Sequence, residues 1–166
     1  MVKVLLKRLN PKAQIPKYKT DGSSGLDLMA LIENPIKIKP QESSLISTGI
    51  SIAIPQDTEV QIRPRSGLAA KSNIGVLNTP GTIDSDYRGE IGVILINHGK
   101  NIFDIERGMR IAQIVFQKLP EIEIIESQTL SKTDRDKGGF GSTGLDWVEV
   151  ICSKYKKESF TQLRLF

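Results

Sequence analysis

The chain has 166 residues, a formal net charge of +4 and a single cysteine, with 39% hydrophobic and 25% charged residues. This size and composition are typical of one globular domain with its own core, and they argue against a disordered chain. The longest aliphatic run, residues 93–96, is far too short to cross a bilayer, and the first ten residues lack the pattern of a signal peptide. Because the lone Cys152 cannot form an internal disulfide, we expect a reducing, cytoplasmic location.

Short apolar or alternating runs recur along the chain between glycine and proline turn signals. They predict strands at residues 2–9, 26–32, 36–38, 46–54, 59–62, 90–97, 111–119 and 122–125, with the clearest two-residue alternation in ISTGISIAI. One short helix is expected around SGLAAKSN, with Ser66 as its N-cap. Strands spaced in this way predict an all-β fold, either a barrel or a jelly-roll-like sandwich.

The stretch NTPGTIDSDYRGEIGVILIN, residues 78–97, places acidic residues between a turn and a strand. Pro80 and Gly81 fit the two central positions of a type II turn, with a positive φ at the glycine. The segment therefore predicts a hairpin whose mouth carries Asp84, Asp86, Tyr87 and Arg88. Acids at such a mouth either satisfy local backbone N–H groups or form a functional site, and the residues of this stretch alone favour the first reading.

Few other patterns carry chemistry. His98 is the only histidine, and no serine lies in a nucleophile elbow, so a Ser-His-Asp triad is not indicated. The loop GGFGSTG lacks the lysine of a phosphate-binding P-loop, although its backbone N–H groups can still close around phosphate oxygens. The basic pI of about 9.2 suggests an anionic partner without choosing between nucleic acid, membrane surface and phosphate ester. With 5% aromatic residues the chain is a poor stacking platform for nucleic acid.

Five segments in a fixed order carry a family resemblance. They are SGLDLMA (24–30), RPRSGLAAK (63–71), NTPGTIDSDYRGEIG (78–92), RGMRIAQ (107–113) and RDKGGFGSTG (135–144). Each is weak alone, but together they resemble the five motifs of the trimeric deoxyuridine triphosphatases (dUTPases), over nearly all of residues 1–144. The resemblance implies a distorted jelly-roll β-barrel at residues 1–133, a glycine-rich lid motif at 134–144 and an extension of unknown role at 145–166.

The resemblance also implies an activity. Members of the family hydrolyse dUTP to dUMP and pyrophosphate, which supplies dUMP for thymidylate synthesis and keeps uracil out of DNA. They use Mg²⁺ and work as homotrimers whose sites combine residues of several subunits, with no nucleic-acid or membrane partner. Two alternatives stay open: a dCTP deaminase of the same fold, whose catalytic glutamate motif we do not find, and a non-enzymatic nucleotide-sensing or nucleic-acid-binding β domain.

Roles in catalysis follow from the positions that match the motifs. By similarity Asp84 activates the water that attacks the α-phosphorus and meets the 3′-hydroxyl, and Gln113 lies near that water. Tyr87 packs on the sugar and excludes a 2′-hydroxyl. Asp27 is linked to magnesium through water, and the metal itself rides mainly on the three phosphates. Asp86 receives no role.

Roles in substrate binding come from the second, third and fifth motifs. Arg65, Ser66 and Gly67 match the segment that holds phosphates through charge-assisted bonds and helix N-terminal amides. The uracil would be recognised by a hairpin pocket framed by Asn78, Gly81, Thr82, Ile83 and Gly92. In the lid motif Arg135 would meet the γ-phosphate and Phe140 would stack over uracil, with Gly141 and Ser142 beside the substrate.

Three positions depart from the family pattern. Gly92 replaces a lysine that is common in bacterial members, so any contact there is made by the backbone. Met109 stands where an acid is frequent, and Asp136 replaces a glycine of the lid motif. We expect Asp136 to change how the lid holds phosphate.

Overall fold

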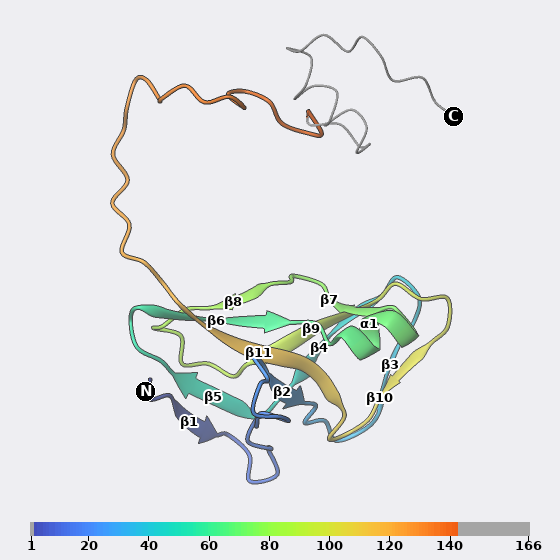
Figure 1. Cartoon of the computed structure of the whole chain (residues 1–166). Helices are drawn as coiled ribbons and strands as arrows, with labels where there is room; N and C mark the ends of the chain where they lie inside the picture. The colour runs from blue at the N-terminus through green and yellow to red at the C-terminus, as the bar shows by residue number, and fades with distance from the viewer. Residues whose placement is uncertain (1, 143–166) are drawn as a thin grey trace, which may run out of the picture. The chain divides into compact units, whose positions relative to one another are not determined.

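The computed structural model describes residues 2–142, which fall into two units that meet between residues 122 and 123, so that residues 2–122 belong to the first unit and residues 123–142 to the second. The first unit contains eleven strands and one helix (Figure 1). They are β1 (Leu5–Arg8), β2 (Leu26–Met29), β3 (Ile36–Ile38), β4 (Ser43–Ser47), β5 (Ile50–Ala53), β6 (Thr58–Arg63), α1 (Ser66–Ser72), β7 (Ile74–Val76), β8 (Gly81–Ile83), β9 (Gly92–Asn97), β10 (Phe103–Ile105) and β11 (Arg110–Lys118).

Every pair of neighbouring strands is antiparallel. The largest sheet has the order β2-β11-β6-β8, and a three-stranded sheet has the order β4-β9-β7. Two further pairs, β1 with β5 and β10 with β3, complete the unit. The prediction of an all-β, jelly-roll-like fold with one short helix is confirmed for the part of the chain that the structure describes.

The core is almost entirely aliphatic. Alternation on β9 and β6 sends every second side chain inward, so that Val93, Leu95 and Val60 are fully buried. The amide of Asn97 is buried too, but its nitrogen donates to the carbonyls of Ile38 and Asn101, each at 2.8 Å. A buried polar side chain with all these partners costs little, and it ties three segments together.

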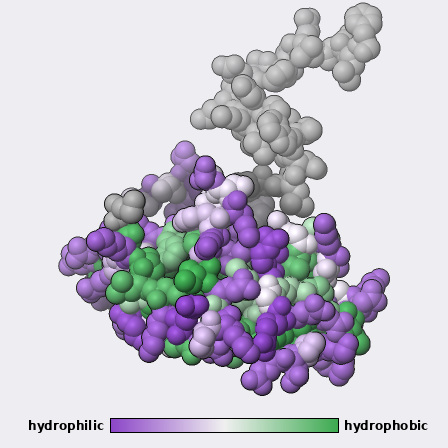
Figure 2. Space-filling view, turned by 90° about the horizontal axis from the view of Figure 1, so that it is seen from below, coloured by the Kyte–Doolittle hydropathy of each residue, from purple (hydrophilic) through white to green (hydrophobic). Residues whose placement is uncertain are grey.

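An apolar groove lies on the side of the unit formed by β1 and β5. Its volume is about 580 Å³, and it is lined among others by Val4, Leu6, Ile15, Tyr18 and Phe116. The view from below shows apolar surface gathered between charged side chains on this side of the molecule (Figure 2). Within residues 2–142, no helix is both long enough and apolar enough to cross a membrane.

The strand predicted at residues 46–54 is two strands. Gly49 has φ +70°, and a Cβ there would lie 2.2 Å from Leu31 Cδ2, so only glycine fits this break between β4 and β5. At the same break, the Oγ1 of Thr48 donates to the carbonyl of Ile91. The prediction of one continuous strand was wrong because the alternation runs through a turn.

The strand predicted at residues 122–125 was also wrong. Ile122, Ile124 and Ile125 are exposed, and no described strand pairs with them. Conversely, β7, β8 and β10 were not predicted; each has only three residues, and a strand of this length shows too little alternation to be identified reliably.

The N-cap of the helix lies one residue earlier than predicted, so the helix begins at the predicted cap residue. Arg65 is the N-cap, in extended conformation, and its carbonyl accepts hydrogen bonds from the N–H groups of Leu68 and Ala69, both at 3.0 Å. Ser66 is therefore the first helical residue and makes no side-chain cap, so the expectation for Ser66 was wrong. Asn73 ends the helix in the left-handed conformation.

The turn at Pro80 also differs from the expected one. The Thr79–Pro80 peptide bond is cis, and Gly81, whose φ is not positive, already begins β8 and is buried. The two strands that flank residues 84–91 do not form a hairpin with each other, since β8 pairs with β6 while β9 pairs with β4 and β7. The type II turn and the simple hairpin were therefore wrong, and the acidic stretch connects two sheets.

Candidate functional site

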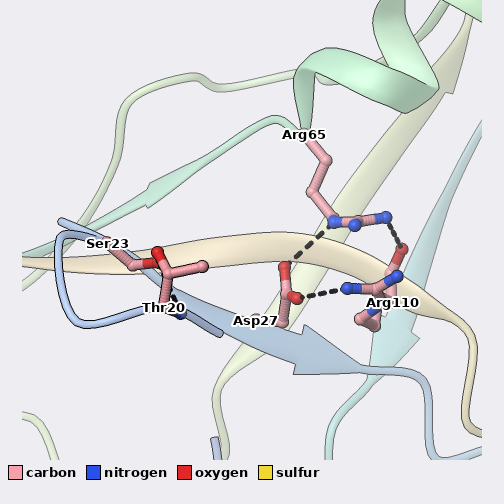
Figure 3. Close-up of polar contacts among 5 residues, drawn as sticks. All are labelled: Thr20, Ser23, Asp27, Arg65 and Arg110. Carbon is pink, nitrogen blue, oxygen red and sulfur yellow. Dashed lines mark hydrogen bonds and ion pairs between the residues drawn. The ribbon is translucent and has the colours of Figure 1, made fainter. Parts of the chain in front are cut away.

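An ion-pair cluster forms where β2, β11 and the start of α1 meet. Asp27 Oδ1 accepts from Arg65 Nε at 3.0 Å, and Asp27 Oδ2 accepts from Arg110 Nη1 at 2.9 Å (Figure 3). Arg65 also donates through Nη1 to the carbonyl of Arg110 at 3.2 Å. The Asp27 side chain is only 13% exposed, so it needs these partners. Two guanidinium groups on one carboxylate leave a net positive charge, which suits an anionic ligand.

Arg110 joins the cluster because of an irregularity in β11. The register between β11 and β2 shifts between Arg110, which faces Met29, and Ala112, which faces Leu28. A bulge of one residue changes which face the following side chains occupy, so Arg110 lies on the same face as Gln113 and its partner Asp27. Arg110 received no role from the sequence. It lies within RGMRIAQ, but simple alternation assigns it to the opposite face from Gln113.

Gln113 is held in the same neighbourhood. Its Nε2 donates to the carbonyl of Pro64 at 2.9 Å, directly before Arg65. A Cβ on Gly25 would lie 2.5 Å from Gln113 Oε1, so the absence of a side chain at Gly25 leaves room for the amide. Gly25 is a second residue without a role in the sequence-based prediction, and only the strand pairing reveals it.

A separate pocket of about 360 Å³ collects residues of the third motif. Asn78, Ile83, Tyr87 and Gly92 line it, together with Leu45, Ser47, Glu90 and Ile94. A Cβ on Gly92 would meet Leu45 Cδ1 at 2.7 Å, and one on Gly81 would meet Asn78 Nδ2 at 3.0 Å. Both glycines therefore keep space for their neighbours at this pocket. Thr82 is exposed on β8 and pairs with Gln61.

The connection from Asp84 to Ile91 is stabilised by local hydrogen bonds to its own backbone carbonyls. The N–H of Tyr87 donates to the carbonyl of Asp84 at 3.2 Å, and Arg88 Nη1 donates to the carbonyl of Ser85 at 2.7 Å. Asp84 and Asp86 are exposed, and within residues 2–142 neither carboxylate accepts a hydrogen bond or forms an ion pair. The simpler reading, in which these acids satisfy turn N–H groups through their side chains, is not what the structure has.

The residues expected in the lid belong to the second unit and are described by themselves. Arg135 Nε donates to the carbonyl of Gly138 at 2.8 Å, and the N–H of Gly138 donates back to the carbonyl of Arg135. Phe140 is fully exposed with φ +49°, Gly141 has φ +86°, and the N–H of Ser142 donates to Gly139 at 3.0 Å. Residues 143–144 of the motif and the extension at 145–166 lie outside the described residues.

Solved structures share the fold. The dUTPase of Staphylococcus bacteriophage 80alpha with dUpNHpp matches with a TM-score of 0.79 and 23% identity, over 86% of this chain and 99% of that one. The dUTPase of phage phi11 of S. aureus, described with a structural Mg(II) ion, matches with a TM-score of 0.71 and 18% identity over 78% of this chain and 99% of that one.

Sequence relatives are closer. A deoxyuridine 5′-triphosphate nucleotidohydrolase of Rickettsia bellii is 58% identical over 146 residues, covering 87% of this chain and 97% of the relative. One of Alkaliphilus metalliredigens is 53% identical over 145 residues, 87% of this chain and 99% of the relative. The family model described as dUTPase matches residues 11–144. The chain therefore belongs to the dUTPase family.

Proposed function

We propose that the chain hydrolyses dUTP to dUMP and pyrophosphate. The observation that supports this most is the grouping of motif residues: the third motif lines one pocket, while the first, second and fourth motifs meet around Asp27. The relatives are named as nucleotidohydrolases of deoxyuridine 5′-triphosphate, and none of those reported above is a deaminase or a binding protein. The two alternative functions are accordingly not favoured.

In this mechanism Asp84 is the general base. Its carboxylate accepts a proton from water, the water oxygen bonds to the α-phosphorus, and the bond from the α-phosphorus to the bridging oxygen of the β-phosphate breaks. The electron pair leaves with pyrophosphate. The exposure of Asp84 and the absence of a described partner for its carboxylate support this role, because both oxygens are available to a water and to the 3′-hydroxyl. Gln113 orients the same water through its amide.

Phosphates bind near the arginine cluster. Arg65 supplies charge, and Ser66 and Gly67 supply backbone N–H groups at the start of α1. Each oxygen of Asp27 already accepts from a guanidinium, which disfavours direct metal ligation but leaves lone pairs for water. The residues thus fit Mg²⁺ carried by the phosphates, with Asp27 contributing through water. When bound, Mg²⁺ neutralises charge on the leaving pyrophosphate.

Uracil and deoxyribose occupy the pocket of about 360 Å³. Asn78 offers its amide, while Gly81, Thr82, Ile83 and Gly92 offer backbone groups that match the donor and acceptors of uracil. Cytosine presents the opposite pattern and would leave polar groups unpaired, which such sites reject by roughly 10⁴ or more in favourable cases. The ring of Tyr87 at the pocket wall excludes a 2′-hydroxyl.

Closure and assembly complete the proposal. Arg135 binds the γ-phosphate, Phe140 stacks on uracil, and Gly141 and Ser142 close the lid, which excludes water. The enzyme is a cytoplasmic homotrimer with shared sites. Exposed apolar side chains beside the groove of about 580 Å³, Val2, Ile15 and Tyr18, support a subunit interface, and the single cysteine supports a reducing location.

A substrate panel tests the proposal. Pyrophosphate release is measured with dUTP, dCTP, dTTP and UTP under the same conditions with Mg²⁺. We expect strong preference for dUTP, with dUMP as the other product. Ammonia or free uracil as a product, or equal turnover of all four nucleotides, would contradict the proposed function.

Truncation tests the proposed domain organisation. A chain that stops after Gly144 should keep most activity, whereas a chain that stops after Thr133 should lose it by losing Arg135 and Phe140. Circular dichroism checks that both retain β structure. If both were folded and equally inactive, the extension at residues 145–166 would be part of the site.

A further inference from the structure

The ring of Tyr87 rests on the backbone just after it. Its Oη donates to the carbonyl of Glu90 at 3.0 Å, and its own N–H is held by the carbonyl of Asp84 at 3.2 Å. The ring lines the pocket of about 360 Å³ while 44% of the residue stays exposed. With few contacts to bury it, its direction depends on the residues between 87 and 90.

Gly89 is where the ring passes closest to the chain. A Cβ on Gly89 would lie 2.3 Å from Tyr87 Oη, 2.5 Å from Cζ and 3.0 Å from Cε2. The φ of Gly89 is not among the positive values of the described chain, so an L-residue meets no backbone strain there. Glycine is therefore needed for space, and the atoms that would move are the far end of the Tyr87 side chain, not the backbone.

Glu90 holds the carbonyl that Tyr87 uses. Its carboxylate accepts from the N–H of Gly49 at 2.7 Å and from the hydroxyl of Ser47, both at the turn between β4 and β5. The next residue is fixed to the same turn, because the N–H of Ile91 donates to the carbonyl of Ile50 at 2.9 Å. The position of the Tyr87 hydroxyl is thus tied to β4 and β5, which are distant in sequence.

We propose that Gly89 and Glu90 are specificity-determining positioning residues: Gly89 leaves the space, and Glu90 the fixed carbonyl, that keep the Tyr87 ring where it excludes a 2′-hydroxyl. This inference rests on the proposed function, since it concerns the choice between dUTP and UTP. Gly89 does not line the pocket and Glu90 does, but in this scheme both act through Tyr87.

The first test is Gly89→Ala, with Gly22→Ala as the matched control. A Cβ on Gly22 meets no described atom within 4 Å, and Gly22 is exposed. The measured quantity is the ratio of kcat/KM for dUTP to kcat/KM for UTP. Gly89→Ala should lower this ratio by roughly tenfold or more, mainly through better use of UTP, while Gly22→Ala leaves it unchanged.

The second test asks whether the effect runs through the ring. In the Tyr87→Ala background, adding Gly89→Ala should change the ratio no further, because the atoms in conflict are gone. Glu90→Gln should preserve the ratio, since its amide oxygen still accepts from Gly49, whereas Glu90→Ala should lower it. Tyr87→Phe keeps the ring but removes the donor to Glu90, so it should lower the dUTP to UTP ratio several-fold. This variant replaces the alanine variants if they do not fold.

The outcomes separate the inference from the proposed function. A wild-type chain that shows no preference for dUTP over UTP would overturn both. A wild type that prefers dUTP, together with folded Gly89→Ala, Glu90→Ala and Tyr87→Phe variants of unchanged ratio, would overturn this inference alone. A further loss on adding Gly89→Ala to Tyr87→Ala would show that Gly89 acts elsewhere, and would overturn it as well.

Discussion

The two groups of candidate site residues differ in how the chain holds them. Asp27 and Gln113 lie on paired strands and Arg65 follows one, and each of these side chains is hydrogen-bonded within the chain. Asp84 lies in a connection between two sheets, and its carboxylate has no described partner. The side chains proposed to bind phosphate, magnesium-bound water and the attacking water are thus fixed before a ligand binds, which lowers the entropic cost of binding. The Asp84 carboxylate, which we propose activates water, stays available to the ligand.

The largest expected effect concerns Asp84, whose carboxylate has no described partner. Asp84→Asn should lower kcat on the order of 10² or more, since an amide cannot take the proton of water. Binding of a non-hydrolysable dUTP analogue, followed by calorimetry, should persist. Asp86→Asn, two residues away and also exposed, is the matched control and should keep near-normal kcat. A near-normal kcat for Asp84→Asn would reject its role as the base.

A smaller effect is expected from Asp27, which is paired with two arginines. Asp27→Asn removes the charge that holds Arg65 and Arg110, and a hydrogen bond to a charged group is worth about 1.5–3 kcal/mol, or roughly 10- to 100-fold in kcat/KM. The loss should appear mainly in KM for dUTP. Asp104→Asn breaks the exposed pair with Lys37 and should change neither constant. An Asp27→Asn variant with normal kinetics would mean that the cluster is structural only.

Gly25→Ala tests the position of Gln113, and we expect a still smaller effect. Its Cβ would lie 2.5 Å from Gln113 Oε1 and would displace the amide, so kcat should fall roughly 3- to 30-fold. Gly22→Ala again provides the control. If Gly25 acts through Gln113, adding Gly25→Ala to Gln113→Ala should leave kcat unchanged. If the two losses in kcat multiply instead, Gly25 does not act through Gln113.

The smallest expected effect concerns stability. It measures what an exposed ion pair, Lys118 with Asp57, contributes to folding, in contrast to the largely buried Asp27 of the arginine cluster. The hydrogen bond from Lys118, above all, keeps the pKa of Asp57 below its ordinary value of 3.8. A lowered pKa in the folded state stabilises the fold above pH 3.8, and this contribution is lost as the pH falls through the folded-state pKa. Lys118→Ala should therefore lower Tm slightly at neutral pH, and the difference from wild type should shrink below pH 3.8. A difference that did not depend on pH would contradict this.

Sequence patterns predicted the class of fold correctly, and the resemblance named most residues of the candidate site. Long strands such as β9 and β11 are predicted from their apolar residues, and motif residues such as Asp84 and Arg65 were identified by resemblance. Arg110 was missed because a bulge reverses its face, and it meets Asp27 across 83 residues of sequence. Gly25 and Gly89 were missed because their role is to lack a side chain next to a neighbour in space.

Tyr87 also allows ligand binding in the pocket to be followed by tyrosine fluorescence. The chain has three tyrosines and one tryptophan, Tyr18, Tyr87, Tyr155 and Trp147, so replacing the other three with phenylalanine leaves Tyr87 as the only strong ultraviolet emitter. Its phenol donates to the carbonyl of Glu90, and its ring lines the pocket. A nucleotide that stacks on or near this ring should change its emission. Ligand binding can then be titrated by intrinsic fluorescence, without a dye or a label on the nucleotide.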